Sequence, residues 1–117
     1  MRLDTARRFA LSLPETTEEP HFDMSSFRVK GKILATIPVG GKVLHLNVDP
    51  DEGRALLEED PDAFEEIVWG QRHQTEWVRV ILAKADRTQV QELLEDAWRR
   101  KAPKRLLAAY DATHPPR

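Results

Sequence analysis

The stretch from Phe27 to Val48, FRVKGKILATIPVGGKVLHLNV, decides the fold that we expect for this chain. Apolar and polar side chains alternate at both of its ends, and β-branched residues are frequent, which is the pattern of half-buried β-strands. Gly40-Gly41 lies between two such segments, and adjacent glycines accept the positive φ angles of a tight hairpin turn. The stretch therefore predicts a hairpin near Gly40, with strand structure from His21 to Val48.

Helices are expected before and after this stretch. Apolar side chains recur at helical spacing over residues 3–13, with Asp4 as the expected N-cap and Pro14 as the residue that stops the helix. Asp49 followed by Pro50 is the signature of a second helix start, because aspartate caps well and proline is tolerated at the first helical position. We therefore predict two helices that flank the strands.

The second half of the chain predicts another hairpin and a longer helix. Residues 64–82 contain two strand-like segments, with Gly70 to Gln74 as their loop. Asp86 is the expected N-cap of a helix that carries the clearest apolar stripe in the chain. That stripe consists of Val90, Leu93, Leu94, Ala97 and Trp98. We expect residues 104–110 to add a turn or two of helix and residues 111–117 to form a frayed tail.

Together these elements predict one α+β domain over residues 1–110, in which an antiparallel sheet carries two hairpin wings and helices pack on one face. A chain of 117 residues with 40% hydrophobic side chains can supply a single core. The sequence has no cysteine, which excludes disulfides and thiolate metal sites and is typical of a cytoplasmic protein. No apolar run reaches the roughly 20 residues that span a bilayer, so we expect no membrane contact.

Positive charge is concentrated in two segments, although the formal net charge is -2. Residues 24–48 and residues 97–110 contain no acid. Their cations are Arg28, Lys30, Lys32 and Lys42 in the first segment, and Arg99, Arg100, Lys101, Lys104 and Arg105 in the second. Clustered cations of this kind are what contact with nucleic-acid phosphates requires, and Arg72 in the second hairpin loop would extend the set.

Each basic segment also has a structural interpretation, and the sequence leaves both interpretations open. If residues 28–32 form one strand, Arg28, Lys30 and Lys32 share a face as a basic row, which would meet successive phosphates. The same alternation fits a solvated sheet face or a guarded edge strand. The second segment fits a helix C-terminus, where cations complement the helix dipole.

Histidine and tryptophan side chains define a second candidate site. His21 lies among acidic residues, while Trp69 and His73 flank the second hairpin turn, where an exposed indole would stack on a base or contact a partner. Ordinary structural roles compete with this interpretation: a histidine that bonds a loop carbonyl and a tryptophan that covers the sheet. The four histidines have no metal-ligand spacing, and no catalytic or cofactor motif is present, so we expect no metal, no cofactor and no catalytic residue.

The sequence also resembles the MmcQ/YjbR-like family. The likeness is carried by ALSLP at residues 10–14, the acidic pair at residues 18–19, His21, and FRVKGK at residues 27–32. Further along, TEWVRVIL and VQELLEDAWRRKAPKRL resemble the family's tryptophan-containing strand and terminal helix. The resemblance implies a fold similar to the double-wing DNA-binding domain of a phage transcription activator, with two hairpin wings on a sheet backed by helices.

The function expected from these observations is nucleic-acid binding, with DNA as the partner and phosphates contacted through the hairpin wings. The expected contact residues are Arg28, Lys30, Lys32, Lys42 and Arg72. The alternative is a protein-interaction or small-ligand adaptor, which would use a groove between sheet and helices near His21, Trp69 and His73. An enzyme ranks after both.

Overall fold

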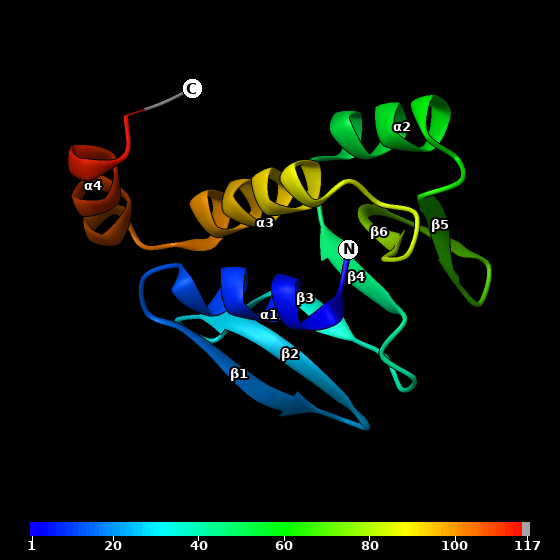
Figure 1. Cartoon of the computed structure of the whole chain (residues 1–117), viewed down its shortest axis with the longest axis horizontal. Helices are drawn as coiled ribbons and strands as arrows, with labels where there is room; N and C mark the ends of the chain where they lie inside the picture. The colour runs from blue at the N-terminus through cyan, green and yellow to red at the C-terminus, as the bar shows by residue number, and fades with distance from the viewer. Residues whose placement is uncertain (116–117) are drawn as a thin grey trace.

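The computed structural model describes residues 1–115 and leaves residues 116–117 undescribed. Helices and strands follow one another along the chain as labelled in Figure 1. Their bounds are α1 Leu3–Ser12, β1 Thr16–His21, β2 Met24–Val29, β3 Lys32–Ile37, β4 Val43–Asn47, α2 Pro50–Glu59, β5 Phe64–Trp69, β6 Arg72–Ile81, α3 Arg87–Lys101 and α4 Lys104–Thr113. This order confirms the predicted α+β class.

The strands form a six-stranded antiparallel sheet in the order β1-β2-β3-β4-β6-β5. Consecutive strands pair as hairpins, except that β4 pairs with β6 and leaves β5 at an edge. Helices α1 and α3 pack over β1, β3 and β4, while α2 packs over β5 and β6, so that these helices cover one face of the sheet (Figure 1). We call the opposite side the open face.

The strand register shows which side chains belong to each face, because residues directly opposite in an antiparallel pair point to the same side. Phe27 pairs with Ala35, Ala35 with Leu46 and Leu46 with Val78, and all four are buried under the helices. The next row lies on the open face. It runs across all six strands through Glu19, Ser26, Thr36, His45, Arg79 and Glu65.

The core has two parts. The larger lies between the sheet and helices α1 and α3, and the smaller gathers around Trp98 where α3 meets α4 and the end of α1. All five residues of the predicted stripe on α3 are buried, and Trp98 has no exposed surface. The helical stripe was therefore predicted correctly, because spacing along a single helix decides which face is apolar.

Two of the three predicted N-caps are confirmed. The Asp49 carboxylate accepts hydrogen bonds from the backbone N–H groups of Asp51 and Glu52, and that of Asp86 accepts one from Gln89. The assignment of Asp4 was wrong, because α1 begins at Leu3 and Arg2 occupies the N-cap position, two residues earlier than predicted. Asp4 lies in the first helical turn and pairs with Arg7.

Three hairpin features differ from the sequence prediction. Residues 16–21 form β1, which was not predicted and which pairs along its whole length with β2. Lys30 and Gly31 have φ angles of 50° and 80° and form the turn between β2 and β3, so the predicted continuous strand over residues 28–32 was wrong. The second wing turns at residues 70–71 rather than over residues 70–74, because Arg72 already belongs to β6.

The C-terminal helix is longer than predicted. Helix α4 continues to Thr113, and Asp111 within it forms an ion pair with Arg99 of α3, so residues 111–113 are helical rather than frayed. The His114 ring stacks on the Tyr110 ring at a centroid distance of 4.1 Å. The last two residues of the predicted tail, 116–117, lie outside the described part of the chain.

Candidate functional site

The basic row predicted on residues 28–32 does not form, because the chain reverses at Lys30-Gly31. Arg28 lies on the open face opposite Ile33. Lys32 pairs with Val29, whose side chain is buried under the helices, and therefore points to the helix side of the sheet. The three cations thus have three different directions.

Lys30 forms an intramolecular ion pair at the protein surface. Its ammonium lies 2.6 Å from the Glu15 carboxylate, and the Arg105 guanidinium contacts the same carboxylate at 3.1 Å. Hydrogen bonds from Arg105 and then from Lys30 lower the pKa of Glu15 to about 2. Glu15 therefore remains charged at neutral pH and links the β2–β3 turn to the start of α4.

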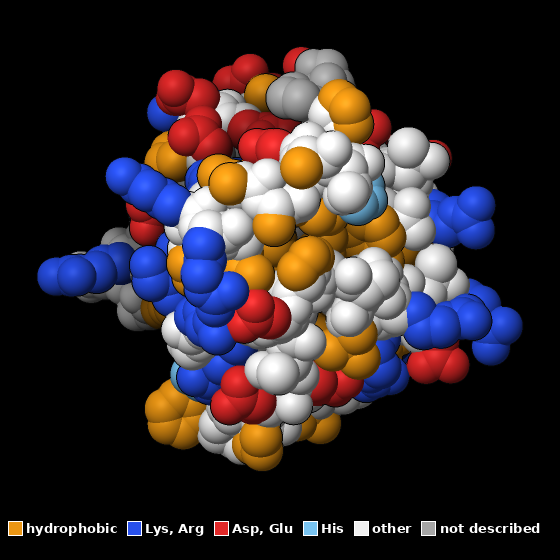
Figure 2. Space-filling model, turned by 90° about the vertical axis from the view of Figure 1, so that its left-hand side faces the viewer, with side chains coloured by type: hydrophobic (Ala, Val, Ile, Leu, Met, Phe, Trp, Pro, Cys, Tyr) orange, Lys and Arg blue, Asp and Glu red, His pale blue; other side chains and the backbone are white. Residues whose placement is uncertain are grey.

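Most arginines of the second basic segment also have partners within the chain. Arg99 contacts Asp111 and Glu95, and Arg100 donates to the carbonyl oxygen and the side-chain oxygen of Asn47. Figure 2, which views the end of the molecule that carries α4, shows cations interspersed with acids around apolar and neutral surface. The contacts of these arginines attach α3 and α4 to each other and to the rest of the fold, a role that differs from the expected complement to a helix dipole.

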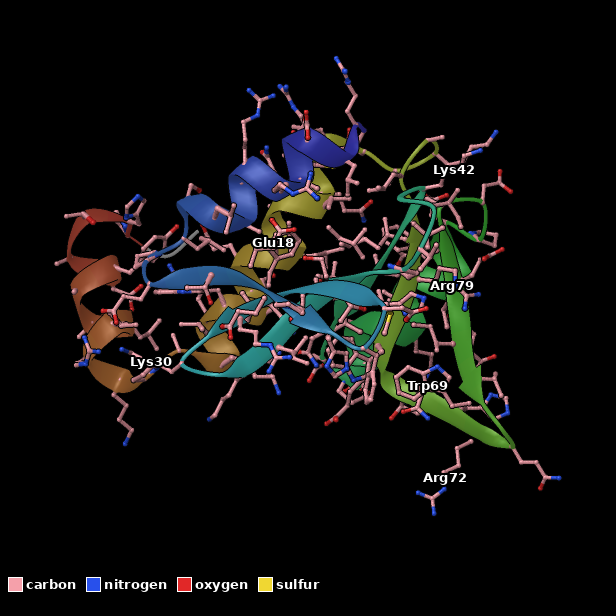
Figure 3. The ribbon with its side chains drawn as sticks, turned by 90° about the horizontal axis from the view of Figure 1, so that it is seen from below. Glu18, Lys30, Lys42, Trp69, Arg72 and Arg79 are labelled. Carbon is pink, nitrogen blue, oxygen red and sulfur yellow. The ribbon has the colours of Figure 1, made fainter. Side chains whose placement is uncertain are left out.

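Lys42 and Arg72 differ from Lys30 in having no carboxylate partner among residues 1–115. Lys42 ends the loop of the first wing, and its carbonyl accepts a hydrogen bond from Leu82 beyond the end of β6. Arg72 begins β6 opposite Trp69 in the second wing. In Figure 3, Lys42, Arg79, Trp69 and Arg72 follow one another along one end of the ribbon, while Lys30 lies at the other end.

The β1–β2, β3–β4 and β5–β6 turns lie on the same half of the ribbon (Figure 1), and an exposed apolar side chain lies at or next to each of them. These side chains are Phe22 in the β1–β2 turn, Val39 in the β3–β4 loop and Trp69 at the end of β5, exposed by 90%, 76% and 56%. Single exposed apolar side chains are common on protein surfaces and do not by themselves define a contact surface.

The open face also contains a small pocket to which all six strands contribute. It brings His21 from one edge of the sheet and Trp69 from the other edge together with His45 and Trp77. The sequence therefore identified two of its residues, but the predicted groove between sheet and helices was misplaced, because only strand residues and none from a helix line this pocket. His73 is not part of it and pairs instead with Glu66.

His45 is the most constrained polar group of this pocket. The Arg79 side chain donates from Nε to His45 Nε2 at 3.3 Å, and Nδ1 of His45 is buried without a hydrogen-bond partner in the described structure. Burial and then the Arg79 charge lower the pKa of His45. The ring is therefore neutral at physiological pH.

His45, Trp77 and Arg79 were not predicted as site residues. Alternation along β6 already places Trp77 and Arg79 on one side and Val78 and Val80 on the other. That signal could have identified a polar face on β6. It could not have placed His45 there, because the pairing of β4 with β6 is not encoded locally.

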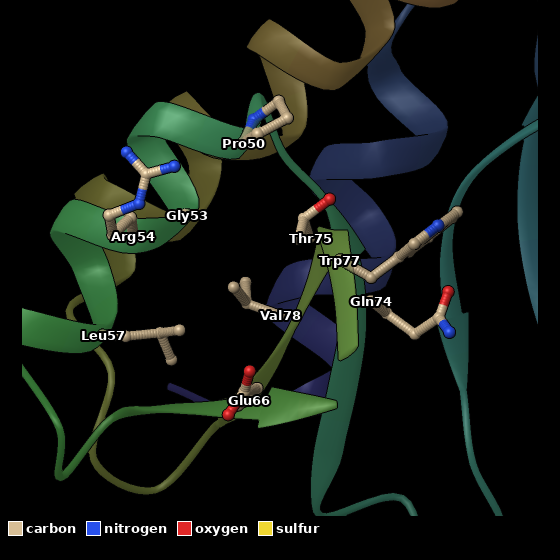
Figure 4. A pocket seen from close by; sticks show the side chains of 9 residues that line it. All are labelled: Pro50, Gly53, Arg54, Leu57, Glu66, Gln74, Thr75, Trp77 and Val78. Carbon is tan, nitrogen blue, oxygen red and sulfur yellow. The ribbon is translucent and has the colours of Figure 1, made fainter. Parts of the chain in front are cut away.

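A further pocket, of about 120 Å³, lies on the opposite side of the sheet, between α2 and the second wing (Figure 4). Its floor is formed where Gly53 of α2 approaches the sheet. A Cβ atom at Gly53 would lie 2.9 Å from Cγ2 of Val48 and 3.6 Å from the Thr75 carbonyl oxygen. The absence of a side chain at Gly53 thus allows α2 to pack closely on the sheet.

We expect Gly53→Ala to destabilise the protein by about 1 kcal/mol. Replacing a helical glycine by alanine ordinarily gains about 1 kcal/mol, but crowding the buried Val48 side chain costs about 1 to 3 kcal/mol. Urea unfolding of Gly53→Ala, Val48→Ala and the double variant measures the coupling. The double variant should be more stable than the sum of the single effects predicts, and a stabilising Gly53→Ala would contradict the packing argument.

No helix within residues 1–115 has both the length and the apolar character needed to cross a membrane. In the same residues no three or more histidine, aspartate or glutamate side chains are grouped so as to hold a metal ion. The open face offers hydrogen-bond donors and aromatic rings, a combination suited to binding.

Comparison with known proteins agrees with the fold. The YjbR family model matches residues 11–100, and the chain therefore belongs to the YjbR family. A solved structure, the Deinococcus radiodurans protein DR2400 with the family-model domain DUF419, is similar with a TM-score of 0.73 and 24% sequence identity, over 96% of this chain and 86% of that chain. No curated protein matches the sequence. At this identity the likeness supports the fold alone.

Proposed function

We propose that this YjbR-family chain is a cytoplasmic nucleic-acid-binding module that holds a single strand of DNA or RNA along strand β6. The observation that carries the proposal is the alignment of Lys42, Arg79, Trp69 and Arg72 along one end of the sheet (Figure 3). Strand β6 has ten residues, which corresponds to about 30 Å of extended chain. This length accommodates several nucleotides.

These aligned side chains are three cations and one indole, a combination that favours a single strand over a duplex. Bases of a single strand are free to stack, and the Trp69 indole is exposed at the rim of the open face. Lys42 and Arg72 supply phosphate contacts without having to break an existing ion pair, and Arg79 and Arg28 add charge on the open face. From the predicted set, Lys30 and Lys32 are left outside this interface, because of the Glu15 pair and the helix-side direction described above.

The test is fluorescence anisotropy with labelled single-stranded and duplex oligonucleotides from low to moderate salt. With about four phosphate contacts, log K for a single strand should fall against log salt with a slope near -3. In the double variant Lys42→Glu/Arg72→Glu, we expect affinity to fall at least tenfold for every sequence. Trp69→Ala should weaken single-strand binding by about 1 to 3 kcal/mol.

A matched control is Arg8→Glu/Arg87→Glu, which makes the same charge change at exposed positions on helices α1 and α3. It should leave binding within about twofold of the wild type. Thermal midpoints of all variants should agree closely, because exposed charges contribute little to stability. Absence of binding at low salt, or equal binding by the wing variant and the helix control, would refute the proposed function.

A further inference from the structure

The open-face pocket has a volume of about 60 Å³ and differs from the rest of the surface in its lining. Its walls are apolar or aromatic, including Met24, Ile33, Ile67 and Trp77, and its polar groups are histidines and one threonine. No acidic residue lines it. The pocket therefore offers no carboxylate that would neutralise a cation.

The His45 ring supplies a hydrogen-bond donor that the described chain does not use. A guanidinium can only donate, so the bond from Arg79 requires that His45 Nε2 is unprotonated. The neutral ring then carries its proton on Nδ1, which is buried and unpartnered. Leaving a buried donor unsatisfied is costly. Nδ1 has almost no accessible surface, so an acceptor oxygen in the pocket reaches it only when the lining side chains shift, and the bond then formed would remove that cost.

The charges around the pocket favour an anionic acceptor. Arg79 lies behind His45, and Arg28 donates toward Nδ1 of His21 at 3.3 Å, so a guanidinium contacts each of the two histidines. Glu65 lies 3.7 Å from Arg79, and Glu19 lies on the same face of the sheet opposite Ser26, so carboxylates also occur around the pocket. A carboxylate ligand would meet the His45 donor and the two guanidinium groups that contact the histidines.

The volume of the pocket further restricts the chemical group that can bind in it. An engineered apolar cavity of about 150 Å³ holds benzene, so 60 Å³ accommodates a group of about four heavy atoms rather than a whole ring. A carboxylate has that size and only two oxygens to satisfy. Phosphate has four oxygens, and the apolar walls could not hydrogen-bond those facing away from His45. Trp69, half exposed at the rim, offers a flat surface to whatever carries the carboxylate.

We propose that this pocket binds the carboxylate of a small organic acid, with His45 Nδ1–H donating to a carboxylate oxygen and the apolar or aromatic body of the acid lying against Trp69. The site shares Trp69 and Arg79 with the proposed nucleic-acid interface, but its hydrogen bond from His45 does not require that nucleic acid binds. The ligand class is an aryl or apolar-bodied monocarboxylate.

Benzoate is the probe, and benzamide is its neutral match in shape. Both are titrated into the whole protein, and binding is followed by tryptophan fluorescence and by side-chain ¹⁵N NMR of His45. We expect benzoate to bind about ten- to hundredfold more tightly than benzamide and to shift the His45 Nδ1–H resonance. Acetate should bind more weakly than benzoate because it lacks the ring that contacts Trp69.

Two variants at one position separate the hydrogen bond from the shape of the pocket. His45→Asn places an amide N–H near the position of Nδ1 and should retain benzoate binding, whereas His45→Leu removes the donor and should lose at least tenfold in affinity. Equal binding of benzoate and benzamide, or no binding of benzoate at millimolar concentration, would overturn the inference.

A last comparison distinguishes the sources of the carboxylate. A short peptide ending in phenylalanine with a free C-terminus is compared with its C-terminal amide. Tighter binding of the free peptide than of benzoate would identify a peptide terminus as the source, and binding of benzoate alone would identify a free acid. If both peptides bind equally while benzoate does not, the carboxylate inference is wrong.

Discussion

Trp98→Ala is expected to lower the free energy of unfolding by about 4 kcal/mol, within the range of about 3 to 5 kcal/mol for deletion of a buried large aromatic side chain. The Trp98 side chain has no exposed surface and joins α3 to α4 and to the end of α1. Its indole packs against the Tyr110 ring at a centroid distance of 4.8 Å. Its Nε1–H donates to the Pro14 carbonyl oxygen at 3.0 Å.

Alanine at this position would therefore leave a cavity and an unpaired carbonyl together. Denaturant unfolding measures the effect, and Trp69→Ala is the matched control, because the same deletion at a half-exposed indole should cost only about 0.5 kcal/mol. A loss below about 1 kcal/mol for Trp98→Ala would show that the α3–α4 junction does not stabilise the fold.

Arg100→Met is expected to cost about 2 kcal/mol, although Arg100 belongs to a segment whose cations could have served a ligand. The guanidinium donates to the backbone oxygen and to Oδ1 of Asn47, both at 3.0 Å. Asn47 is 4% exposed, so water cannot readily replace these bonds, and methionine retains only the aliphatic part of the side chain. A hydrogen bond from a charged donor contributes about 1.5 to 3 kcal/mol.

The control for this prediction is Arg54→Met on α2. Arg54 is 68% exposed in its side chain, and among residues 1–115 it pairs only with Asp51 one turn away, an arrangement worth about 0.5 kcal/mol or less. Chemical denaturation of both variants under the same conditions provides the comparison. Similar losses for the two variants would mean that the Asn47 contact does not hold α3 on the sheet.

The local properties of this chain were readable from its sequence. The stripe on α3 was predicted residue by residue, and the caps at Asp49 and Asp86 were predicted with their helices. Each of these features depends on residues at most a few turns apart, so spacing and residue type suffice to predict them. The hairpin near Gly40 is of the same kind.

Two secondary-structure predictions were wrong because the local sequence pattern is compatible with more than one structure. FRVKGK alternates regularly, and the alternation continues through Lys30-Gly31 even though the chain turns there with two positive φ angles. Residues 16–21 contain few apolar side chains and one proline, and they become a strand because β2 offers a paired edge. In both places the partner strand, rather than the segment itself, decides the structure.

The candidate site was decided by the tertiary structure. His21, His45 and Trp69 are far apart in sequence and meet only because β4 pairs with β6 and all six strands contribute to one pocket on the open face. Likewise, Lys30 was a candidate for phosphate contact until the fold placed Glu15 beside it. Sequence determined which faces of the elements are apolar, because that depends on neighbours along the chain. Which charges remain unpaired and which rings share a pocket depends on contacts between distant segments, and these arise only when the sheet is assembled.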